Sequence, residues 1–246
     1  MYKEPLLDKI RRVTKRILKS STLGKVVYPA IQKVWRKFAI PARIRRLHRH
    51  GYEVIADMHN LMVTNNIPYY CDCGTLLGFI RDKGFIKHDE DIDICIMPDF
   101  TPLSRVLKVF LDAGYGFVHG FKYDKRFIEF TVKHPNHITI DVFQHVKNSA
   151  DSHFLDEIFI RWFPGRRYPD ETANTGLKFL LRGPDSITET KIKDVEVAIP
   201  TNAEEVLDSE YGPWRIPDSG FNSEQLPHEE LPDFVYRISK EEALSM

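Results

Sequence analysis

The sequence has few cysteines and no long apolar run. Its three cysteines, Cys71, Cys73 and Cys95, include no Cys-x-x-Cys pair, so neither a disulfide framework nor a structural zinc motif is indicated. No stretch reaches the roughly 18 consecutive apolar residues of a membrane-spanning helix. The N-terminus lacks the apolar core and cleavage site of a secretory signal. These absences favour a globular protein in a reducing, cytoplasmic setting.

A formal net charge of zero conceals a strong asymmetry along the chain. Residues 1–50 contain 15 Lys and Arg against two acids, Glu4 and Asp8, which leaves 20 basic and 33 acidic groups for the other 196 residues. The 246 residues, 42% of them hydrophobic, are enough to bury a core. The charge pattern predicts a basic arm, residues 1–46, attached to an acidic body.

Apolar residues recur at helical spacing in residues 6–18 and again in residues 27–38, with Lys and Arg between them. A basic amphipathic helix carrying Trp35 and Phe38 suits an anionic membrane surface. Packing of the arm on its own domain and contact with nucleic acid are the alternatives. The acidity of the body argues against nucleic acid, so we expect no nucleic-acid partner.

The remaining chain alternates helical and strand patterns. Helices are expected over residues 47–66, 76–81, 103–111 and 203–210, and strands over residues 69–71, 92–97, 117–119, 127–132, 137–143, 195–199 and 234–238. This order predicts an α+β fold with a mixed, mostly antiparallel sheet flanked by helices. We expect a catalytic domain over residues 47–216 and an acidic C-terminal tail, residues 217–246, that docks on it.

Four acids gather between residues 89 and 93, and the last two alternate with isoleucine. Residues i and i+2 of a strand share a face, so Asp91 and Asp93 stand roughly 6.5–7 Å apart at Cα. Carboxylates at that separation repel unless a cation or proton intervenes. The pair is therefore predicted to hold Mg²⁺, with Mn²⁺ as the alternative. Asp89 and His88 are expected to be accessory.

A third carboxylate is expected from Asp141, a lone acid in the β-type run of residues 137–143. An unpaired buried carboxylate would be unfavourable there, whereas beside Asp91 and Asp93 it could complete a two-metal clamp and deprotonate an attacking hydroxyl. The phosphate side of the site is expected earlier in the chain. Residues predicted to contact donor phosphates are Gly74, Thr75, Arg81 and Lys83.

These motifs resemble the LicD/fukutin family. The matching segments are Gly-Thr-Leu-Leu-Gly at 74–78, Arg81, Phe85-Ile86, residues 89–94, Ile-Asp-Val-Phe at 140–143, residues 199–202 and Tyr-Gly-Pro-Trp at 211–214. His88 and Glu90 depart from the family's usual Trp-Asp-Asp-Asp-Ile-Asp run. The resemblance implies a nucleotidyltransferase-type fold, with Asp91, Asp93 and Asp141 as metal ligands.

The resemblance also implies a reaction. Such enzymes transfer a phospho-alcohol, such as phosphocholine or an alditol phosphate, from a CDP-linked donor to a glycan hydroxyl and release CMP, in cell-surface polysaccharide or glycoconjugate synthesis. The basic arm would then place the enzyme on the inner membrane face, near a lipid-linked acceptor. A nucleotide-sugar glycosyltransferase that uses Asp-x-Asp is the runner-up, and a non-catalytic nucleotide-binding module is the third alternative.

Overall fold

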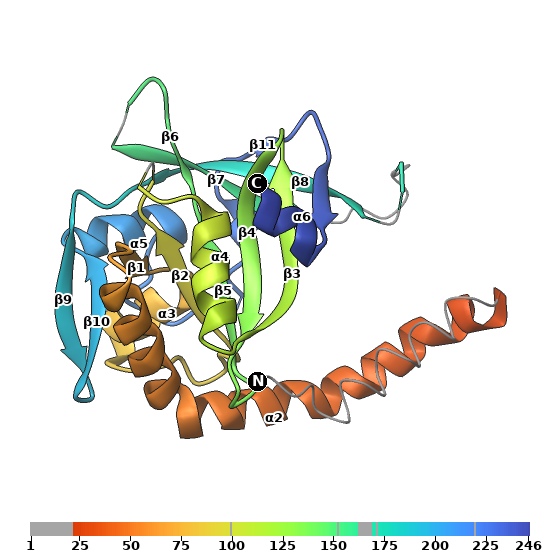
Figure 1. The fold of residues 1–246 in the computed structure, drawn as a ribbon, viewed down its shortest axis with the longest axis horizontal. Coiled ribbons are helices and arrows are strands. Elements are labelled where there is room, and N and C mark those ends of the chain that lie inside the picture. The colour runs from red at the N-terminus through yellow and green to blue at the C-terminus, as the bar shows by residue number, and fades with distance from the viewer. Residues whose placement is uncertain (1–21, 99, 152, 162–168, 171, 219) are drawn as a thin grey trace.

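Most strands of the protein join one large curled sheet with helices on its two faces (Figure 1). The computed structural model describes residues 22–98, 100–151, 153–161, 169–170, 172–218 and 220–246. The expected helix at residues 6–18 lies outside these residues. The predicted α+β class, with a mixed and mostly antiparallel sheet flanked by helices, is confirmed.

The strand order of the large sheet is β1-β2-β5-β4-β3-β12-β8-β7-β6, and β11 pairs with β8 beside this path. Its strands are β1 (Tyr69–Cys71), β2 (Ile92–Ile96), β3 (Gly116–Tyr123), β4 (Arg126–Lys133), β5 (Thr139–Phe143), β6 (Val146–Lys147), β7 (Phe154–Arg161), β8 (Ala173–Arg182), β11 (Glu229–Glu230) and β12 (Val235–Ile238). β2 and β5 pair in parallel. A separate antiparallel hairpin joins β9 (Ile187–Ile192) to β10 (Val195–Pro200).

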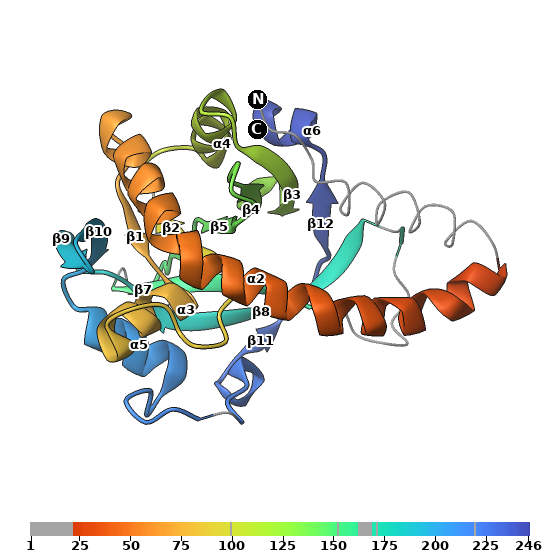
Figure 2. The same ribbon diagram turned by 90° about the horizontal axis from the view of Figure 1, so that it is seen from below.

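One continuous helix, α2 (Thr22–Thr64), replaces the two helices expected over residues 27–38 and 47–66. Pro41 lies inside α2, although an interior proline removes one helical hydrogen bond. The expected boundary between the arm and the catalytic domain, at residues 46 and 47, therefore falls within a helix. The N-terminal half of α2 projects beyond the sheet, and its C-terminal half packs on the core (Figure 2).

The two faces of the sheet have different chemistry, and this difference creates the site. Ile92, Ile94, Ile140 and Val142 point into the main core, where α2 and α4 (Leu103–Asp112) cover them. Because side chains alternate along a strand, the residues between them point to the opposite face. That face carries the acids of β2 and β5.

Shorter helices cover the remaining edges. They are α3 (Cys73–Leu77), the π-helical turn η1 (Gly78–Asp82) that continues it, α5 (Ala203–Tyr211), the 3-10 turn η2 (Ser223–Gln225) and α6 (Lys240–Ser245). α3 and α5 share a small apolar cluster that contains Leu76, Leu207 and Trp214. This cluster fixes the turn that precedes the acidic segment.

The C-terminal residues pack on the domain through β12. This strand pairs with β3 on one side and β8 on the other, both antiparallel. Val235 is fully buried and Ile238 nearly so. The long β7–β8 hairpin beyond it comes from a stretch whose aromatic, glycine and proline residues gave no clear strand pattern.

Candidate active site

Acids from two neighbouring strands form the centre of the candidate site. β2 and β5 run parallel in a register that places Asp93 beside Asp141. Asp91 lies just before β2, and its carboxylate interacts electrostatically with those of Asp141 and Asp89. The structure therefore brings Asp91, Asp93 and Asp141 together, with Asp89 beside them.

The turn at Gly74 and Thr75 is built against this acidic centre. A methyl group on Gly74 would lie 3.2 Å from Oδ2 of Asp89 and 3.5 Å from Oδ2 of Asp93, so the glycine leaves room for both carboxylates. Thr75 is fully buried, and its Oγ1 accepts a hydrogen bond of 2.9 Å from the backbone N–H of Asp93. Thr75 therefore joins the turn to the strand that carries the metal-ligand candidates.

Asp141 is oriented by a short chain of hydrogen bonds across β4 and β3. Thr131 lies opposite Asp141 in the β4–β5 pair, and its hydroxyl donates to Oδ1 of Asp141. Thr131 Oγ1 also lies 2.8 Å from Nε2 of His119. Burial lowers the pKa of His119 to about 4, so its neutral ring donates from Nε2 to the threonine hydroxyl.

Arg43 brings positive charge from α2 to the edge of this centre. Its guanidinium lies 2.8 Å from the carboxylate of Glu90, and its charge opposes the rise in the pKa of Asp141. Within the described part of the chain, three buried atoms here have no hydrogen-bond partner: Nε of Arg43, Oδ2 of Asp89 and Oε2 of Glu90. Buried polar atoms of this kind would find a partner in a bound ion or water.

The acids of the centre resist ionisation. Burial, followed by repulsion from Asp141 and Asp89, raises the pKa of Asp91 to about 7. Burial also raises the pKa of Asp89 to about 6. Burial, then Asp91 and Asp141, holds the pKa of Asp93 well above its ordinary value. A divalent cation would offset this repulsion and allow the group to ionise near neutral pH.

Three other residues expected at the site have local contacts or lie at the surface. Arg81 donates two hydrogen bonds, of 2.8 and 2.9 Å, to the carboxylate of Asp82, and a longer one of 3.4 Å to the carbonyl of Trp214. Lys83 donates to the carbonyl of Ile80. His88 is exposed.

A second group of ligand-type side chains lies on the same side of the sheet. Asp72 follows β1, Cys95 lies in β2 and His145 follows β5, and all three are buried. Their donor atoms lie within 4.8 Å of one another, close enough for a metal ion. The expectation that the fold can hold a metal is supported at this general level.

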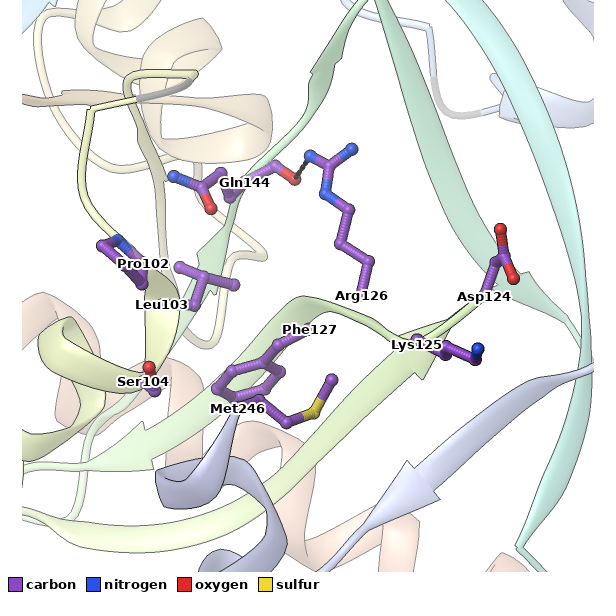
Figure 3. Close-up of a pocket in the computed structure, with 9 residues that line it drawn as sticks. All are labelled: Pro102, Leu103, Ser104, Asp124, Lys125, Arg126, Phe127, Gln144 and Met246. Carbon is purple, nitrogen blue, oxygen red and sulfur yellow. Dashed lines mark hydrogen bonds between the residues drawn. The ribbon is translucent and has the colours of Figure 1, made fainter.

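Two surface cavities lie away from the acids. One cavity, of about 270 Å³, is lined by residues of α4, of the β3–β4 turn and by Met246. Figure 3 shows these lining residues, with Phe127 and Arg126 among them. The other, of about 710 Å³, lies between α2 and the β9–β10 hairpin and includes His59 and Tyr69. Neither is lined by the acids of the candidate site.

Four positions of the site were not found in the sequence: Arg43, Asp72, Thr131 and His119. Arg43 was counted only as part of the basic arm. Thr131 and His119 can be assigned to the site only when the register of β3, β4 and β5 is known, because that register places them next to Asp141. Asp72 has no local signal in the sequence, because its partners are 23 and 73 residues away.

Comparison with known proteins defines the class of this domain. Residues 66–175 match the sequence profile described as LicD/FKTN/FKRP, nucleotidyltransferase domain. This segment is similar to the nucleotidyltransferase domain of the LicD/fukutin family, whose members are phosphotransferases. The predicted family and the predicted class of enzyme are therefore confirmed.

Individual relatives cover different parts of the chain. Ribitol-5-phosphate transferase FKTN is 25% identical in Mus musculus and 26% in Homo sapiens, each over 177 residues, 71% of this chain and 35% of the relative. The uncharacterized protein RP689 of Rickettsia prowazekii is 43% identical over 65 residues, 26% of this chain and 24% of the relative. The chain thus spans about a third or less of these relatives' length.

A solved structure shows a weaker similarity. The lincosamide antibiotic adenylyltransferase LnuA, bound to lincomycin, aligns with a TM-score of 0.36 and 16% identity over 60% of this chain and 78% of that chain. A similarity at that level does not establish a shared fold.

In the described residues, no helix combines the length and apolar character needed to cross a membrane.

Proposed function

We propose that this chain is a Mg²⁺-dependent phosphotransferase that moves a phospho-alcohol from a CDP-linked donor to a glycan hydroxyl and releases CMP. The observation that carries this proposal is the convergence of Asp91, Asp93 and Asp141 on neighbouring parallel strands beside the Gly74 turn. A family relationship to ribitol-5-phosphate transferases supports this class of donor. The class of product would serve cell-surface polysaccharide or glycoconjugate synthesis.

The donor atoms at this centre fit Mg²⁺. They are carboxylate oxygens, the ligands that this ion prefers, and Oδ2 of Asp89 is buried without a hydrogen-bond partner in the described chain. Asp91, Asp93 and Asp141 would hold the ion, with Asp89 as a further oxygen donor. Mn²⁺ has the same ligand preference. The bound ion would offset the negative charge of the donor diphosphate.

The residues of the chain have separable roles in this reaction. We propose that Asp141, held by Thr131, orients the acceptor hydroxyl and takes its proton. The acceptor oxygen forms a bond to the phosphorus distal to the nucleoside, the bond from that phosphorus to the bridging oxygen breaks, and CMP leaves. The backbone of Gly74 lies close to the carboxylates of Asp89 and Asp93, so donor phosphates held there would lie next to the acids.

Two basic side chains at the edge of the site would offset the negative charge of the donor diphosphate. Arg81 and Lys83 lie at the end of η1, and Arg81 is already oriented by Asp82. Exchange of that contact for a donor phosphate would keep a bidentate geometry. Thr75 acts through the position of Asp93, because its buried hydroxyl contacts the strand.

A donor panel tests the reaction directly. The full chain is incubated with Mg²⁺ and with CDP-, UDP- and GDP-linked donors, and the released nucleotide is measured. CMP from a CDP-linked alcohol supports the proposal. Consumption of a UDP- or GDP-sugar would instead support the glycosyltransferase alternative, and binding without turnover would support the non-catalytic module.

The role of the acids is tested by a matched pair of variants. Asp93→Asn should lower CMP release at least about 100-fold, the scale of losing a direct transition-state stabiliser. Asp112→Asn is the control, because Asp112 is an exposed acid on α4 that pairs with Lys108. Near-normal turnover in Asp93→Asn, with Asp112→Asn also normal, would contradict the assignment.

We also propose that the basic arm contacts an anionic membrane surface on the cytoplasmic side. Phe38 is 73% exposed on α2, next in sequence to Arg36 and Lys37, a combination that suits a lipid interface. Phe38→Ser removes the exposed apolar side chain and should reduce co-sedimentation with phosphatidylserine vesicles. Equal sedimentation of both forms, or equal binding to neutral vesicles, would contradict membrane contact.

A further inference from the structure

A second polar cluster lies beside the acidic centre, on the same face of the sheet, and takes no part in the proposed reaction. It comprises Asp72, Cys95, His145, Glu157 and Glu210. These residues come from the end of β1, from β2, from the segment after β5, from β7 and from α5. Five separate parts of the fold thus direct ligand-type side chains to one buried place.

The distances in this cluster suit a small ion. Nε2 of His145 lies 3.2 Å from Oδ2 of Asp72 and 3.7 Å from Oε2 of Glu157. Ligand atoms bound tetrahedrally at the usual zinc distances are roughly 3.3–3.8 Å apart. Sγ of Cys95 and one ligand atom each of Asp72 and His145 all lie within 4.8 Å of one another. A small contraction of these three atoms would bring them to zinc-ligand separations, with Glu157 approaching from β7 as the fourth ligand.

This cluster holds more carboxylates than basic side chains. Asp72, Glu157 and Glu210 are 1%, 4% and 9% exposed, and His145 is the basic side chain among them. Oε2 of Glu210 is buried without a hydrogen-bond partner in the described chain. Buried carboxylates must be paired, protonated or bound to a metal.

Two of the buried carboxylates converge on one basic side chain, since Oδ2 of Asp72 and Oε2 of Glu157 both lie within 3.7 Å of Nε2 of His145. A divalent cation at this place would offset two negative charges and would give the free oxygen of Glu210 a partner.

The mixture of donor atoms selects the kind of metal. The acidic centre offers oxygen alone, which suits Mg²⁺. This cluster adds an imidazole nitrogen and a sulfur, and both favour a borderline-soft transition metal over Mg²⁺. Zinc accepts thiolate, imidazole and carboxylate in one tetrahedral set.

We propose that Asp72, Cys95, His145 and Glu157 form a structural Zn²⁺ site, with Glu210 facing the bound ligands. His145 would bind through Nε2 and carry its proton on Nδ1, and Cys95 would bind as the thiolate. The ion would tie the end of β1 to β2 and β7, next to Asp93 on the same face of β2. This site is distinct from the Mg²⁺ site, since the two share no ligand.

Metal analysis tests the site without any activity assay. The full chain is purified without chelator, and its metal content is measured by mass spectrometry. We expect about one Zn²⁺ per chain, and after exchange with Co²⁺ a thiolate-to-metal absorption band in the near ultraviolet. A folded wild-type chain with no transition metal and no such band overturns the proposal.

Variants assign the ligands. Cys95→Ser and His145→Gln should each lower bound Zn²⁺ at least tenfold and abolish the Co²⁺ band, on the scale of losing a metal ligand. Cys71→Ser is the matched control, because Cys71 is equally buried on β1 and its side chain points to the opposite face. Loss of zinc in Cys71→Ser as complete as in Cys95→Ser contradicts the assignment. If a variant fails to fold, the wild-type Co²⁺ spectrum still decides.

The outcome is independent of the proposed reaction. Asp93→Asn should keep its full complement of Zn²⁺, because Asp93 is not in the ligand set. A chain that binds zinc but releases no CMP would leave this site intact and contradict only the transferase proposal. Loss of zinc in Asp93→Asn would place the metal at the acidic centre and overturn the separate site.

Discussion

Thr75→Val isolates the hydrogen bond that joins the Gly74 turn to the catalytic strand. The side chain is fully buried, and valine has nearly the same shape, so the packing around it should persist. The substitution removes the oxygen that accepts from the backbone N–H of Asp93. The backbone N–H of Asp93 points toward Thr75, on the side of β2 where the backbone carbonyl of Asp93 accepts a hydrogen bond from the N–H of Asp72.

The size of the effect follows from the loss of a buried acceptor. An unpaired buried donor costs about 1–3 kcal/mol. For a domain of this size, each kcal/mol lowers Tm by about 2–4 °C, so the expected loss is about 2–12 °C. Because the freed strand carries Asp93, we also expect Mg²⁺ affinity to fall by roughly tenfold, as for other groups that orient metal ligands.

Two measurements on one set of variants check this reasoning. Tm is measured for the metal-depleted chain, and the Mg²⁺ concentration at half-maximal CMP release is measured for the intact reaction. Thr75→Ser is the control, because it keeps the acceptor oxygen and should stay near wild type in its Mg²⁺ requirement. The reasoning is refuted if Thr75→Val keeps both wild-type values, or if Thr75→Ser loses Mg²⁺ affinity as strongly as Thr75→Val.

Three further outcomes are expected. Thr131→Val removes the hydrogen bond that lowers the pKa of Asp141, so the acidic limb of the pH–activity profile should move to higher pH, while Thr131→Ser should leave it in place. In metal-depleted protein the raised pKa of Asp91, about 7, means that the native state binds more protons than the unfolded state. Tm should therefore fall as the pH rises from about 4 to 7, and it should fall less steeply in Asp91→Asn. Addition of Mg²⁺ should restore Tm above pH 7. Gly74→Ala places a methyl group 3.2 Å from the Asp89 carboxylate, so titration should show weaker Mg²⁺ binding with an unchanged circular dichroism spectrum.

Local patterns in the sequence predicted much of the fold. β1, β2, α4 and α5 lie close to their expected positions, because their alternation and turn residues agree with their burial. The α2 helix was predicted in two pieces, because apolar residues recur at helical spacing in residues 27–38 and again in residues 47–66. Tertiary packing of its C-terminal half overrides that local signal.

The candidate site was predicted only as far as sequence spacing carries information. Asp91 and Asp93 are two residues apart on one chain segment, so their shared face follows from strand geometry. The position of Asp141 beside them depends on the parallel β2–β5 register, which no local pattern determines. Cys95 and His145 show the same limit, because no short-range metal motif joins them.

The position of β12 has a consequence for synthesis on the ribosome. The strands β1 to β5 form one part of the sheet and β6 to β8 another, and β12 is the strand that pairs with both β3 and β8. The nascent chain therefore cannot join the two parts until residues 235–238 have emerged. Long-range pairing of this kind slows folding, and an early β3 edge is open to wrong partners. A chain stalled before residue 235 would contain the acids of the catalytic centre and still expose the unpaired edge of β3. Pairing of β12 is therefore the step that completes the sheet, and it comes late in synthesis.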